Sequence, residues 1–340
     1  MDVAIVLLNW NGASLLKEFL PSVVKYSQQA RIYIIDNGST DSSVSFIESN
    51  YPTISLIKLN ENLGFCGGYN KGLMSIDASY YVLLNTDVEV TDGWLNDPIH
   101  ILSHDSSVGI CQPKIKSWKE KNSFEYAGAA GGYIDYLGYP FCRGRLFNHV
   151  EEDKGQYNDN KEIFWASGAC LFIKAELFKL AGGFDTRFFA HMEEIDLCWR
   201  IKNMGYKAIY CGKSTVYHVG GATLTKNNPK KTFLNFRNSL LYLVKNLPAH
   251  KYLPKIFARL ILDGLAGIYF LCKGDYLHTL AIIKAHVSFY SIVHKFVGRS
   301  KGHAFEPVYK SSIVLDHYFK RKKQTSELQK LKFPDYTSLS

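Results

Sequence analysis

The segment Tyr80-Tyr81-Val82-Leu83-Leu84-Asn85-Thr86-Asp87 decides the fold. Its apolar run has the length and composition of a fully buried strand, and it ends at once in a polar tip that carries a single carboxylate. In an open α/β sheet, ligands bind in the crevice beyond the carboxyl ends of the strands. Asp87 is therefore a candidate oxygen ligand for the Mg²⁺ or Mn²⁺ that accompanies a diphosphate. An Asp after a strand is also an ordinary turn residue, so this interpretation depends on the surrounding sequence.

Strand and helix patterns alternate around this segment. Short apolar runs predict strands at residues 3–8, 31–35, 55–59, 81–84, 167–173 and 207–210. Helical periodicity is expected at residues 14–26, 42–49, 68–76 and 193–204. This rhythm predicts an α/β fold, with a mostly parallel, Rossmann-like sheet and flanking helices. Residues 111–166 show no clear period and predict loops and short antiparallel strands over the crevice.

The chain changes character near residue 228. From residue 226 onward there are 20 Lys and Arg against 6 Asp and Glu, whereas the preceding residues have 20 against 25, within a net charge of +9. We expect a nucleotide-sugar-binding and catalytic domain at residues 1–228 and a helical, basic region at 229–340. Arg259 and Asp263 interrupt the apolar segment 256–272, which argues against a membrane span. Contact with an anionic membrane surface, packing on the catalytic domain and contact with a second subunit all stay open.

The seven cysteines form no C-x-x-C pair and their number is odd. This favours free thiols in a reducing compartment over a disulfide framework or a zinc site. The chain starts with Met1-Asp2, and the apolar run that follows stops at Asn9, too soon for the core of a signal peptide. We therefore expect a cytoplasmic protein, which would be peripheral on the inner face of the cell membrane if its basic region binds lipid.

Polar side chains gather where the predicted parallel strands end. They are Asn9 and Asn11, Asp36, and Asn85 and Thr86 with Asp87. The carboxyl ends of parallel strands share one edge of a sheet, so these side chains can line one crevice. Asp36 could accept hydrogen bonds from a nucleobase or a ribose hydroxyl, although it also suits a turn or a helix N-cap.

A glycine-rich stretch, N-L-G-F-C-G-G-Y-N-K-G, follows at residues 62–72. Its candidate binding residues are Asn62, Gly64, Gly68 and Asn70. Glycines allow backbone amides to approach a ligand closely, and the start of the following helix is partly positive, which suits a diphosphate. The pattern is not the dinucleotide fingerprint G-x-G-x-x-G.

Two later motifs carry titratable groups. In E-E-I-D, Glu193 and Asp196 can share one helix face, and a carboxylate at the helix start could act as a general base. An acidic first turn that favours the helix dipole is the alternative interpretation. His218, which is followed closely by two glycines, could complete a metal site with Asp87 or could be structural.

Taken in order, these motifs resemble the inverting glycosyltransferases of family 2, which have the GT-A fold, and in particular the rhamnosyltransferase-like branch. The resemblance covers residues 3–223. It rests on N-W-N (9–11), D-N-G-S-T-D (36–41), N-L-G-F-C-G-G-Y-N (62–70), L-N-T-D (84–87), G-G-F-D (182–185), E-E-I-D-L-C-W-R (193–200) and H-V-G-G (218–221). It implies that Asp87 is the last Asp of a D-x-D metal motif, with Asn85 at the first position. His218 would contribute to the metal and diphosphate, and Glu194 or Glu193 would be the base.

The implied reaction is a single displacement at the anomeric carbon of a nucleotide-diphosphate sugar, with dTDP-rhamnose or a UDP-sugar favoured. The acceptor would be a hydroxyl of a saccharide, which the adjacent basic region suggests is lipid-linked. Asn9, Asn11, Asp36 and residues 62–70 would hold the nucleotide with Asn85 and Thr86. The residues expected on the sugar and acceptor side are Trp165, Ser167, Gly168, Asp185 and Asp196.

Three other functions are alternatives to a glycosyltransferase. A non-catalytic sugar-nucleotide-binding scaffold of a membrane assembly complex would bind donor without turnover. A nucleotidyltransferase would need a G-x-G-T-R-type loop, which residues 9–12 do not supply. A nucleic-acid binder is suggested only by the basic region, whose aromatic residues fall in apolar helices instead of a base-stacking pattern.

Overall fold

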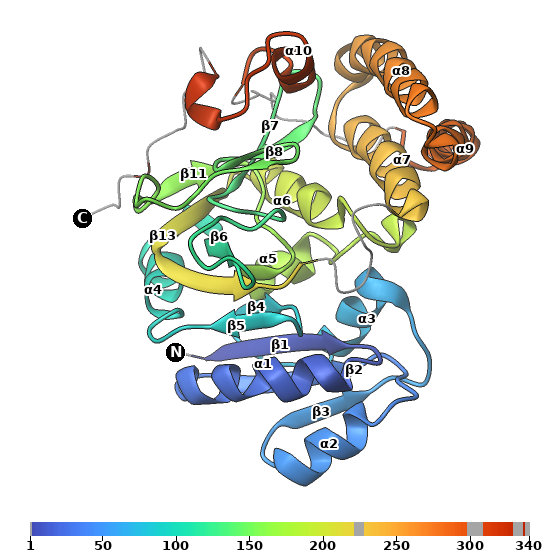
Figure 1. Cartoon of the computed structure of the whole chain (residues 1–340). Helices are drawn as coiled ribbons and strands as arrows, with labels where there is room; N and C mark the ends of the chain where they lie inside the picture. Colours follow the sequence, from blue (N-terminus) through green and yellow to red (C-terminus); the bar gives the residue numbers. More distant parts are fainter. Residues whose placement is uncertain (1, 221–227, 298–308, 329–335, 337–340) are drawn as a thin grey trace.

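A nine-stranded mixed sheet organises the chain (Figure 1). The computed structural model describes residues 2–220, 228–297, 309–328 and 336. Eight strands follow the order β11-β13-β6-β12-β4-β1-β2-β3, and β5 pairs with the far end of β13. The predicted α/β fold with a central sheet and flanking helices is confirmed.

The N-terminal half forms as the sequence predicts. Its parallel strands are β1 (Val3–Asn9), β2 (Arg31–Asp36), β3 (Ser55–Lys58) and β4 (Tyr80–Leu84), and its helices are α1 (Ala13–Tyr26), α2 (Ser43–Asn50) and α3 (Gly64–Leu73). The helix α3 begins four residues earlier than expected, at Gly64, whose φ of 70° lies in the region that favours glycine. Strands β1 and β4 are buried on both faces, which explains their unbroken apolar sequences.

The second half of the sheet is mixed. Its elements are β5 (Val88–Val90), α4 (Asn96–His104), β6 (Val108–Ser117), β11 (Lys161–Ile163), β12 (Cys170–Lys174) and β13 (Lys207–His218). Strand β12 runs antiparallel between β4 and β6, so the parallel arrangement is confined to β3-β2-β1-β4 and to the pair β6–β13. Strand β13 is longer than predicted, and its extension carries His218 to the end of the sheet.

The expectation that irregular structure begins at residue 111 is wrong at its start, because β6 continues to Ser117. The polar residues Gln112 and Lys114 interrupt the apolar pattern of this buried strand. Both have partners in the fold: Gln112 accepts a hydrogen bond from the Ser167 amide at 2.8 Å, and Lys114 pairs with Asp153 at 3.2 Å. The short antiparallel strands expected further on are present. They are β7 (Gly132–Ile134), β8 (Pro140–Cys142), β9 (Arg145–Leu146) and β10 (His149–Val150).

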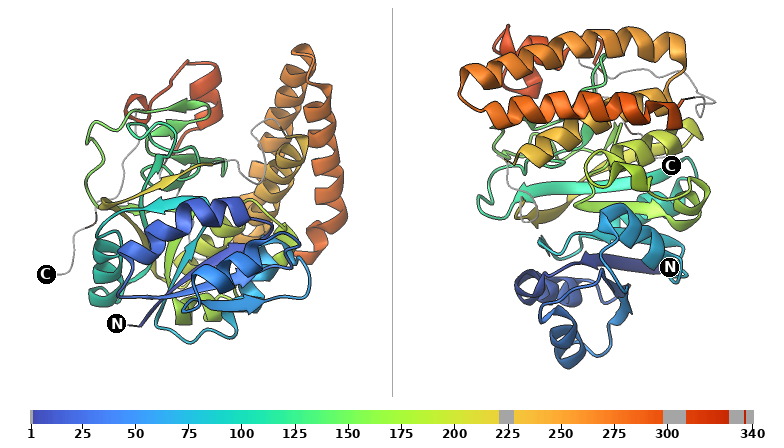
Figure 2. Two further views of the ribbon diagram at one scale, coloured as in Figure 1. Left: turned by 60° about the horizontal axis from the view of Figure 1, so that its bottom comes forward. Right: turned by 90° about the vertical axis from the view of Figure 1, so that its right-hand side faces the viewer.

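Helices dominate the remainder of the chain. They are α5 (Ala175–Leu180), α6 (Glu193–Asn203), α7 (Pro229–Asn246), α8 (Ala249–Cys272), α9 (Tyr276–Ile292) and α10 (Ile313–Tyr318), with 3₁₀ turns at Thr186–Phe188, Val293–Lys295 and Thr325–Glu327. Figure 2 shows α8 and α9 as a long antiparallel hairpin that lies beside α7. None of the helices in the described ranges combines the length and the apolar content needed to cross a bilayer.

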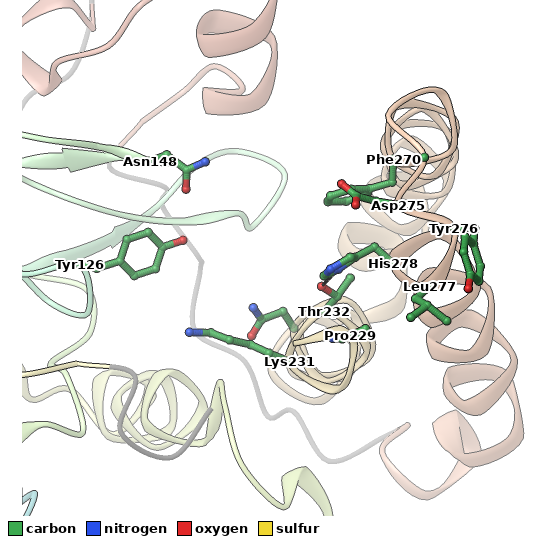
Figure 3. A pocket seen from close by; sticks show the side chains of 12 residues that line it. Tyr126, Asn148, Pro229, Lys231, Thr232, Phe270, Asp275, Tyr276, Leu277 and His278 are labelled. Atoms are coloured by element: carbon green, nitrogen blue, oxygen red, sulfur yellow. Dashed lines mark hydrogen bonds between the residues drawn. The ribbon is translucent and has the colours of Figure 1, made fainter. Parts of the chain in front are cut away.

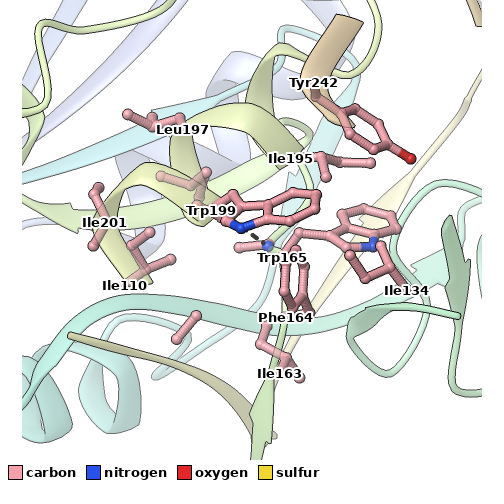
Figure 4. Close-up of a cluster of buried hydrophobic side chains, with 14 of the residues drawn as sticks. Ile110, Ile134, Ile163, Phe164, Trp165, Ile195, Leu197, Trp199, Ile201 and Tyr242 are labelled. Carbon is pink, nitrogen blue, oxygen red and sulfur yellow. Dashed lines mark hydrogen bonds between the residues drawn. The ribbon is translucent and has the colours of Figure 1, made fainter. Parts of the chain in front are cut away.

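Two apolar cores pack on the sheet. Figure 4 shows part of one of them, in which Trp165, Trp199 and Tyr242 join side chains from β6, β7 and α6. All seven cysteines are free thiols, as predicted; six are buried and Cys272, at the end of α8, is exposed. Gly68 serves this packing, because a Cβ there would lie 2.7 Å from the Leu8 side chain of β1.

Candidate active site

The ends of β1 and β2 form one linked polar cluster. Asn9 lies opposite Asp36 in the parallel register, and its Nδ2 donates to Asp36 Oδ1 at 3.1 Å and to Ser39 Oγ at 3.1 Å. The other Asp36 oxygen accepts from the Ser39 amide at 3.1 Å. Asp36 therefore does act as a turn residue. Asn9 Oδ1 is buried with no hydrogen-bond partner.

The asparagines of the neighbouring loops are used to hold backbone. Asn11 Oδ1 accepts from the Thr40 amide at 2.7 Å, and Asn62 Oδ1 accepts from the Gly64 amide at 2.8 Å. Asn70 clasps residue 184 from both sides, since it accepts from the Phe184 amide at 2.9 Å and donates to its carbonyl at 2.7 Å. Asn11, Asn62 and Asn70 thus fix the loops that border the crevice. Asn85 is partly buried, and its backbone N–H donates to the carbonyl of Ala169, the residue before β12, at 3.0 Å. Thr86 follows Asn85 in the chain.

Asp87 and His218 meet although they are far apart in the sequence. The antiparallel pairing of β5 with β13 places His218 opposite Val88, the residue after Asp87. As a result, His218 Nε2 lies 3.1 Å from Asp87 Oδ1, and both side chains are 7% exposed. The structure therefore brings together the two residues that the sequence proposes as metal ligands.

A third carboxylate, Glu125, completes this cluster and was not found from the sequence. Its Oε2 lies 3.3 Å from His218 Nδ1, on the opposite side of the imidazole from Asp87. Gly220 has φ 70°, and a Cβ there would collide with Glu125 Oε1, so both backbone and space require glycine at this position of the H-V-G-G motif. Gly221 lies outside the described residues. No motif surrounds Glu125 in the sequence, so only the fold reveals its place.

The electrostatics of the cluster favour a cationic centre. Burial opposes a charge on His218, but Asp87 and Glu125 outweigh it and raise the pKa of the imidazole to about 10. Conversely, His218 outweighs burial and holds the pKa of Asp87 and of Glu125 below their ordinary values. The buried carboxylates of Asp87 and Glu125 lie on either side of the His218 imidazole, so a positive charge between them is stabilised.

Asp87 and His218 fit one divalent cation. Two neighbouring ligands of an octahedral ion, each about 2.1 Å from it, lie roughly 3.0 Å apart, which matches their 3.1 Å separation. Glu125 would then orient the ring through its other nitrogen, as carboxylates behind metal-bound histidines do. Across the parts of the chain that the structure describes, no three His, Cys, Asp or Glu side chains form a complete cage. That suits Mg²⁺ or Mn²⁺, which complete their shells with waters and substrate phosphates.

Glu193 is buried and Glu194 is partly buried at the start of α6, and each has one buried carboxylate oxygen without a hydrogen-bond partner. Burial raises the pKa of Glu194 to about 7, although backbone amides at the helix start partly offset it. Burial and then the charge of Glu194 raise the pKa of Glu193 well above its ordinary value. The same two carboxylates contribute to the raised pKa of the Cys66 thiol on α3, so the acidic turn lies near the glycine-rich segment.

The loop before this turn is strained. Phe189, His191 and Met192 have φ values of 68°, 67° and 73°, which non-glycine residues rarely adopt and which together cost several kcal/mol. Asn238 of α7 holds the loop, because its Nδ2 donates to the carbonyls of Phe188, Ala190 and His191 at 2.8–3.0 Å. In the sequence, the only indication of this contact is that Asn238 stands among apolar residues of α7. Helix α7 therefore supports the site from beyond the expected domain boundary, and a division of the chain at residue 228 stays a prediction.

Four residues expected beside the sugar and acceptor make hydrogen bonds or ion pairs within the protein. Trp165 is 5% exposed and donates from Nε1 to the Tyr133 carbonyl at 2.9 Å, so its ring faces the core (Figure 4). Ser167 is buried, and its hydroxyl donates a hydrogen bond to the Ala127 carbonyl at 2.6 Å. Asp185 and Asp196 both pair with one buried lysine of α7. Gly168 is less confined, because a Cβ there would make only an ordinary contact with Phe65.

Comparison with known proteins places this geometry in a family. Residues 4–180 match the family model described as glycosyl transferase family 2. An N-acetylglucosaminyl-diphospho-decaprenol L-rhamnosyltransferase of Mycobacterium tuberculosis is 25% identical over 233 residues, which cover 63% of this chain and 75% of that protein.

Solved structures share the fold. GalNAc-T7 with UDP, GalNAc and Mn²⁺ matches 74% of this chain with a TM-score of 0.58 at 16% identity, and this chain spans about half, 49%, of that one. The mannosyltransferase PcManGT from Pyrobaculum calidifontis, in complex with GDP-Man and Mn²⁺, matches 85% of this chain and 87% of its own with a TM-score of 0.53, also at 16% identity.

We expect Glu125→Gln to weaken Mn²⁺ binding by about 10–100-fold, because the ring of His218 loses the carboxylate that orients it. Titration of free Mn²⁺ by electron paramagnetic resonance would measure this without any turnover. The exposed Glu120→Gln is the matched control. Equal Mn²⁺ affinity in Glu125→Gln and the wild type would remove Glu125 from the site.

The raised pKa of Glu194 predicts a pH-dependent stability. The folded state keeps its proton up to about pH 7, whereas the unfolded carboxyl releases it near its ordinary pKa of 4.5. The folded state therefore binds more protons in this window, and its stability falls as the pH rises through it.

Glu194→Gln should accordingly have a higher Tm than the wild type at pH 8, by about 2–4 °C for each kcal/mol relieved, and the gain should shrink toward pH 5. Thermal unfolding at both pH values tests this, with the exposed Glu61→Gln as control. A gain in Tm that is the same at both pH values would show that Glu194 is not the titrating group.

Proposed function

Because this chain belongs to glycosyl transferase family 2, we propose that it transfers a sugar, with inversion, from a nucleotide-diphosphate sugar to a hydroxyl of a saccharide acceptor. The observation that carries this proposal is the presence of two sets of ionisable side chains with different properties. Asp87 and His218 are 3.1 Å apart and suit a diphosphate-bound cation. Glu193 and Glu194, two carboxylates with raised pKa values, begin α6.

Glu194 is the base in this proposal. A pKa of about 7 lets Glu194 be ionised at neutral pH and still accept a proton, which is the balance that general-base catalysis needs. Burial and then the charge of Glu194 raise the pKa of Glu193 well above its ordinary value, which favours the protonated form of Glu193 beside an ionised Glu194. Glu194 takes the proton of the acceptor hydroxyl, whose oxygen forms a bond to the anomeric carbon. The bond from that carbon to the phosphate oxygen breaks, and its electron pair leaves with the diphosphate.

Asp87 and His218 hold the leaving-group side. A bound Mg²⁺ or Mn²⁺ supplies positive charge to the diphosphate, on which negative charge grows as the bond breaks. Glu125 keeps the imidazole of His218 in its orientation, and the buried position of all three side chains strengthens their electrostatic effect.

The names of the relatives support a proposal for the donor and the acceptor. The Mycobacterium tuberculosis relative is named as a rhamnosyltransferase that acts on a lipid diphosphate sugar, and the two solved structures hold UDP or GDP-Man together with Mn²⁺. We propose dTDP-rhamnose or a UDP-sugar as donor and a lipid-linked saccharide as acceptor, in the synthesis of a cell-surface polysaccharide.

A panel of dTDP-rhamnose, UDP-N-acetylglucosamine and GDP-mannose with Mn²⁺ tests this function by thermal shift and by product formation. Asp87→Asn should lose both the donor-dependent shift and transfer. Glu194→Gln should keep the shift and lose about 10²–10⁴-fold in rate, because only the proton acceptor is missing. The exposed Asp92→Asn is the control. A metal-dependent shift in the wild type without turnover on any acceptor would favour the non-catalytic scaffold.

The hairpin of α8 and α9 supports contact with a membrane. Of the 25 large apolar side chains exposed in the described part of the chain, 14 lie between Leu253 and Val297. They recur at helical spacing and form one outward stripe on each helix: Leu253, Phe257, Ile261, Leu265 and Ile268 on α8, and Tyr276, Leu280, Ile283, Val287 and Tyr290 on α9. Exposed apolar surface of this extent marks an interaction site.

The charged residues that interrupt α8 face the protein, so its outer stripe stays apolar. Asp263 accepts from the Tyr139 hydroxyl at 3.0 Å, lies 3.2 Å from His286 Nε2 and pairs with Arg259. Arg259 in turn donates to Ser239 Oγ at 2.7 Å on α7. The inner faces of the hairpin thus pack on the protein, while the outer face does not.

An anionic bilayer fits the charge beside the stripes. Lys273, Lys284 and Lys295 are exposed on the hairpin and at its end, against one exposed acid, Asp275. Lysines near an apolar surface favour anionic lipid by about 1 kcal/mol each. We propose that this face lies on an anionic membrane surface, where a lipid-linked acceptor would be found. That the surface is the inner face of the cell membrane stays a prediction.

Vesicle sedimentation tests the hairpin. The wild type should bind vesicles of phosphatidylcholine with 30% phosphatidylglycerol, and bind phosphatidylcholine alone more weakly, because its lysines lose their anionic partners. Phe257→Glu/Leu265→Glu/Val287→Glu should reduce the bound fraction at least about 10-fold. Met74→Glu/Leu180→Glu, at exposed apolar positions away from the hairpin, should bind like the wild type. A triple variant that sediments normally but changes its mass in light scattering would assign the stripe to a second copy of the chain.

A further inference from the structure

A cavity of about 650 Å³ opens between the hairpin and the sheet domain (Figure 3). One wall is the first two turns of α7 and another is the turn between α8 and α9. The third is formed by Tyr126 and Asn148, from the segment before β7 and the turn between β9 and β10. None of the residues that the sequence singled out lines this cavity, and neither Asp87 nor Glu194 does.

The inner end of the cavity adjoins both halves of the candidate active site. Tyr126 directly follows Glu125, the carboxylate beside His218. Lys231, on the opposite wall, contributes with burial to a lowered pKa of His191, two residues before Glu193. A ligand seated here therefore lies next to the metal cluster on one side and to the acidic turn on the other, which is where an attacking hydroxyl has to come from.

The chemistry of the walls changes along the cavity. Around Tyr126 the wall is polar, and Lys231 Nζ lies 5.7 Å from the centre of the Tyr126 ring. The guanidinium carbon of Arg145, which is buried and does not line the cavity, lies 4.3 Å from the same centre. The opposite wall is mixed. Asp275 and His278 line it, together with Phe270 at the end of α8, and Tyr276 and Leu277 at the start of α9, 60% and 52% exposed. These last residues continue the outward apolar face of the hairpin, so the cavity leads from a cationic end to the proposed membrane surface.

This gradient matches one class of molecule. A sugar diphosphate carries two phosphate groups that favour cationic side chains, and aromatic rings suit the face of a pyranose. A lipid attached to the diphosphate would then leave over Tyr276 and Leu277 without exposing its apolar chain to water. A free saccharide would have no use for the apolar side chains of the mixed wall, and a membrane lipid without a sugar would leave the inner end unfilled.

We propose that this cavity binds the acceptor as a lipid-linked sugar diphosphate, with the sugar toward Tyr126 and the lipid over the start of α9. The proposal rests on the transferase function proposed above and adds the acceptor's binding site and orientation. It separates two diphosphates within one protein: that of the donor at Asp87 and His218, and that of the acceptor beside Lys231.

Isothermal titration with farnesyl-diphospho-N-acetylglucosamine, N-acetylglucosamine 1-phosphate and inorganic pyrophosphate tests this site. The wild type should bind the farnesyl probe most tightly. Lys231→Gln should weaken it at least 10-fold, because the diphosphate loses a cation. Leu277→Ser should weaken the farnesyl probe about threefold and leave N-acetylglucosamine 1-phosphate unchanged. Lys17→Gln, at an exposed lysine of α1 away from the hairpin, is the control.

Asn235→Trp, which places a bulky ring within the cavity, tests the site without removing a charge and should block the farnesyl probe as well. Binding of UDP-N-acetylglucosamine or dTDP-rhamnose should stay unchanged in every variant, which reports on folding and on the donor site. The inference is overturned if the wild type does not bind the farnesyl probe, or if Lys231→Gln and Asn235→Trp bind it as the wild type does.

The two proposals fail in different ways. If the wild type transfers sugar to the farnesyl probe and the cavity variants do so with unchanged KM, the acceptor lies elsewhere and the transferase function stands. If the wild type binds the probe in the cavity but transfers nothing to it from any donor, the transferase function fails, while the equilibrium titrations still decide whether the cavity is a binding site.

Discussion

The arrangement of the site depends on one buried carboxylate, that of Asp196. Its side chain is fully buried and accepts from Arg200 at 2.9 Å, from Lys245 at 2.7 Å and from Asn246 at 2.9 Å. An ionised group at such depth is tolerated only when it is paired and hydrogen-bonded, so this set of partners has little freedom to rearrange. The cluster joins α6, which carries the acidic turn, to α7, against which the hairpin packs. The acidic turn and the hairpin are therefore joined through one buried set of side chains.

The stability of that connection allows unfavourable features nearby. Two carboxylates without full hydrogen bonding begin α6, and three residues in the left-handed region precede them. Each of these would relax if the loop were free, but Asn238 and the glycine-rich helix α3 confine it from two sides. Strain and raised pKa values that occur together at one place are typical of functional sites.

Sequence patterns predicted the elements that carry a continuous apolar run or a single helical period. Strands β1 to β4 and the helices between them were recognisable because one period runs through each. Strand β6 was not, since Lys114 is neutralised by Asp153 from far along the chain, and no local pattern records that pairing. The same limit applies to the site. Asp87 and His218 stand in recognisable motifs, whereas no motif surrounds Glu125. Trp165, which the sequence analysis expects on the sugar and acceptor side, has a ring that faces the core. Composition says that a side chain suits a ligand, and only the fold decides where it points.

The distribution of thiols has a practical consequence. Six cysteines are buried, and burial raises the pKa of several of them, including Cys170 and Cys198, so they remain in the unreactive thiol form. Cys272 is exposed at the very end of α8, beside the cavity wall and the apolar stripe. The native sequence thus carries a single attachment point for a maleimide fluorophore or spin label where bilayer and acceptor would meet. Its emission or relaxation would report the depth of the hairpin in a membrane without any engineered residue.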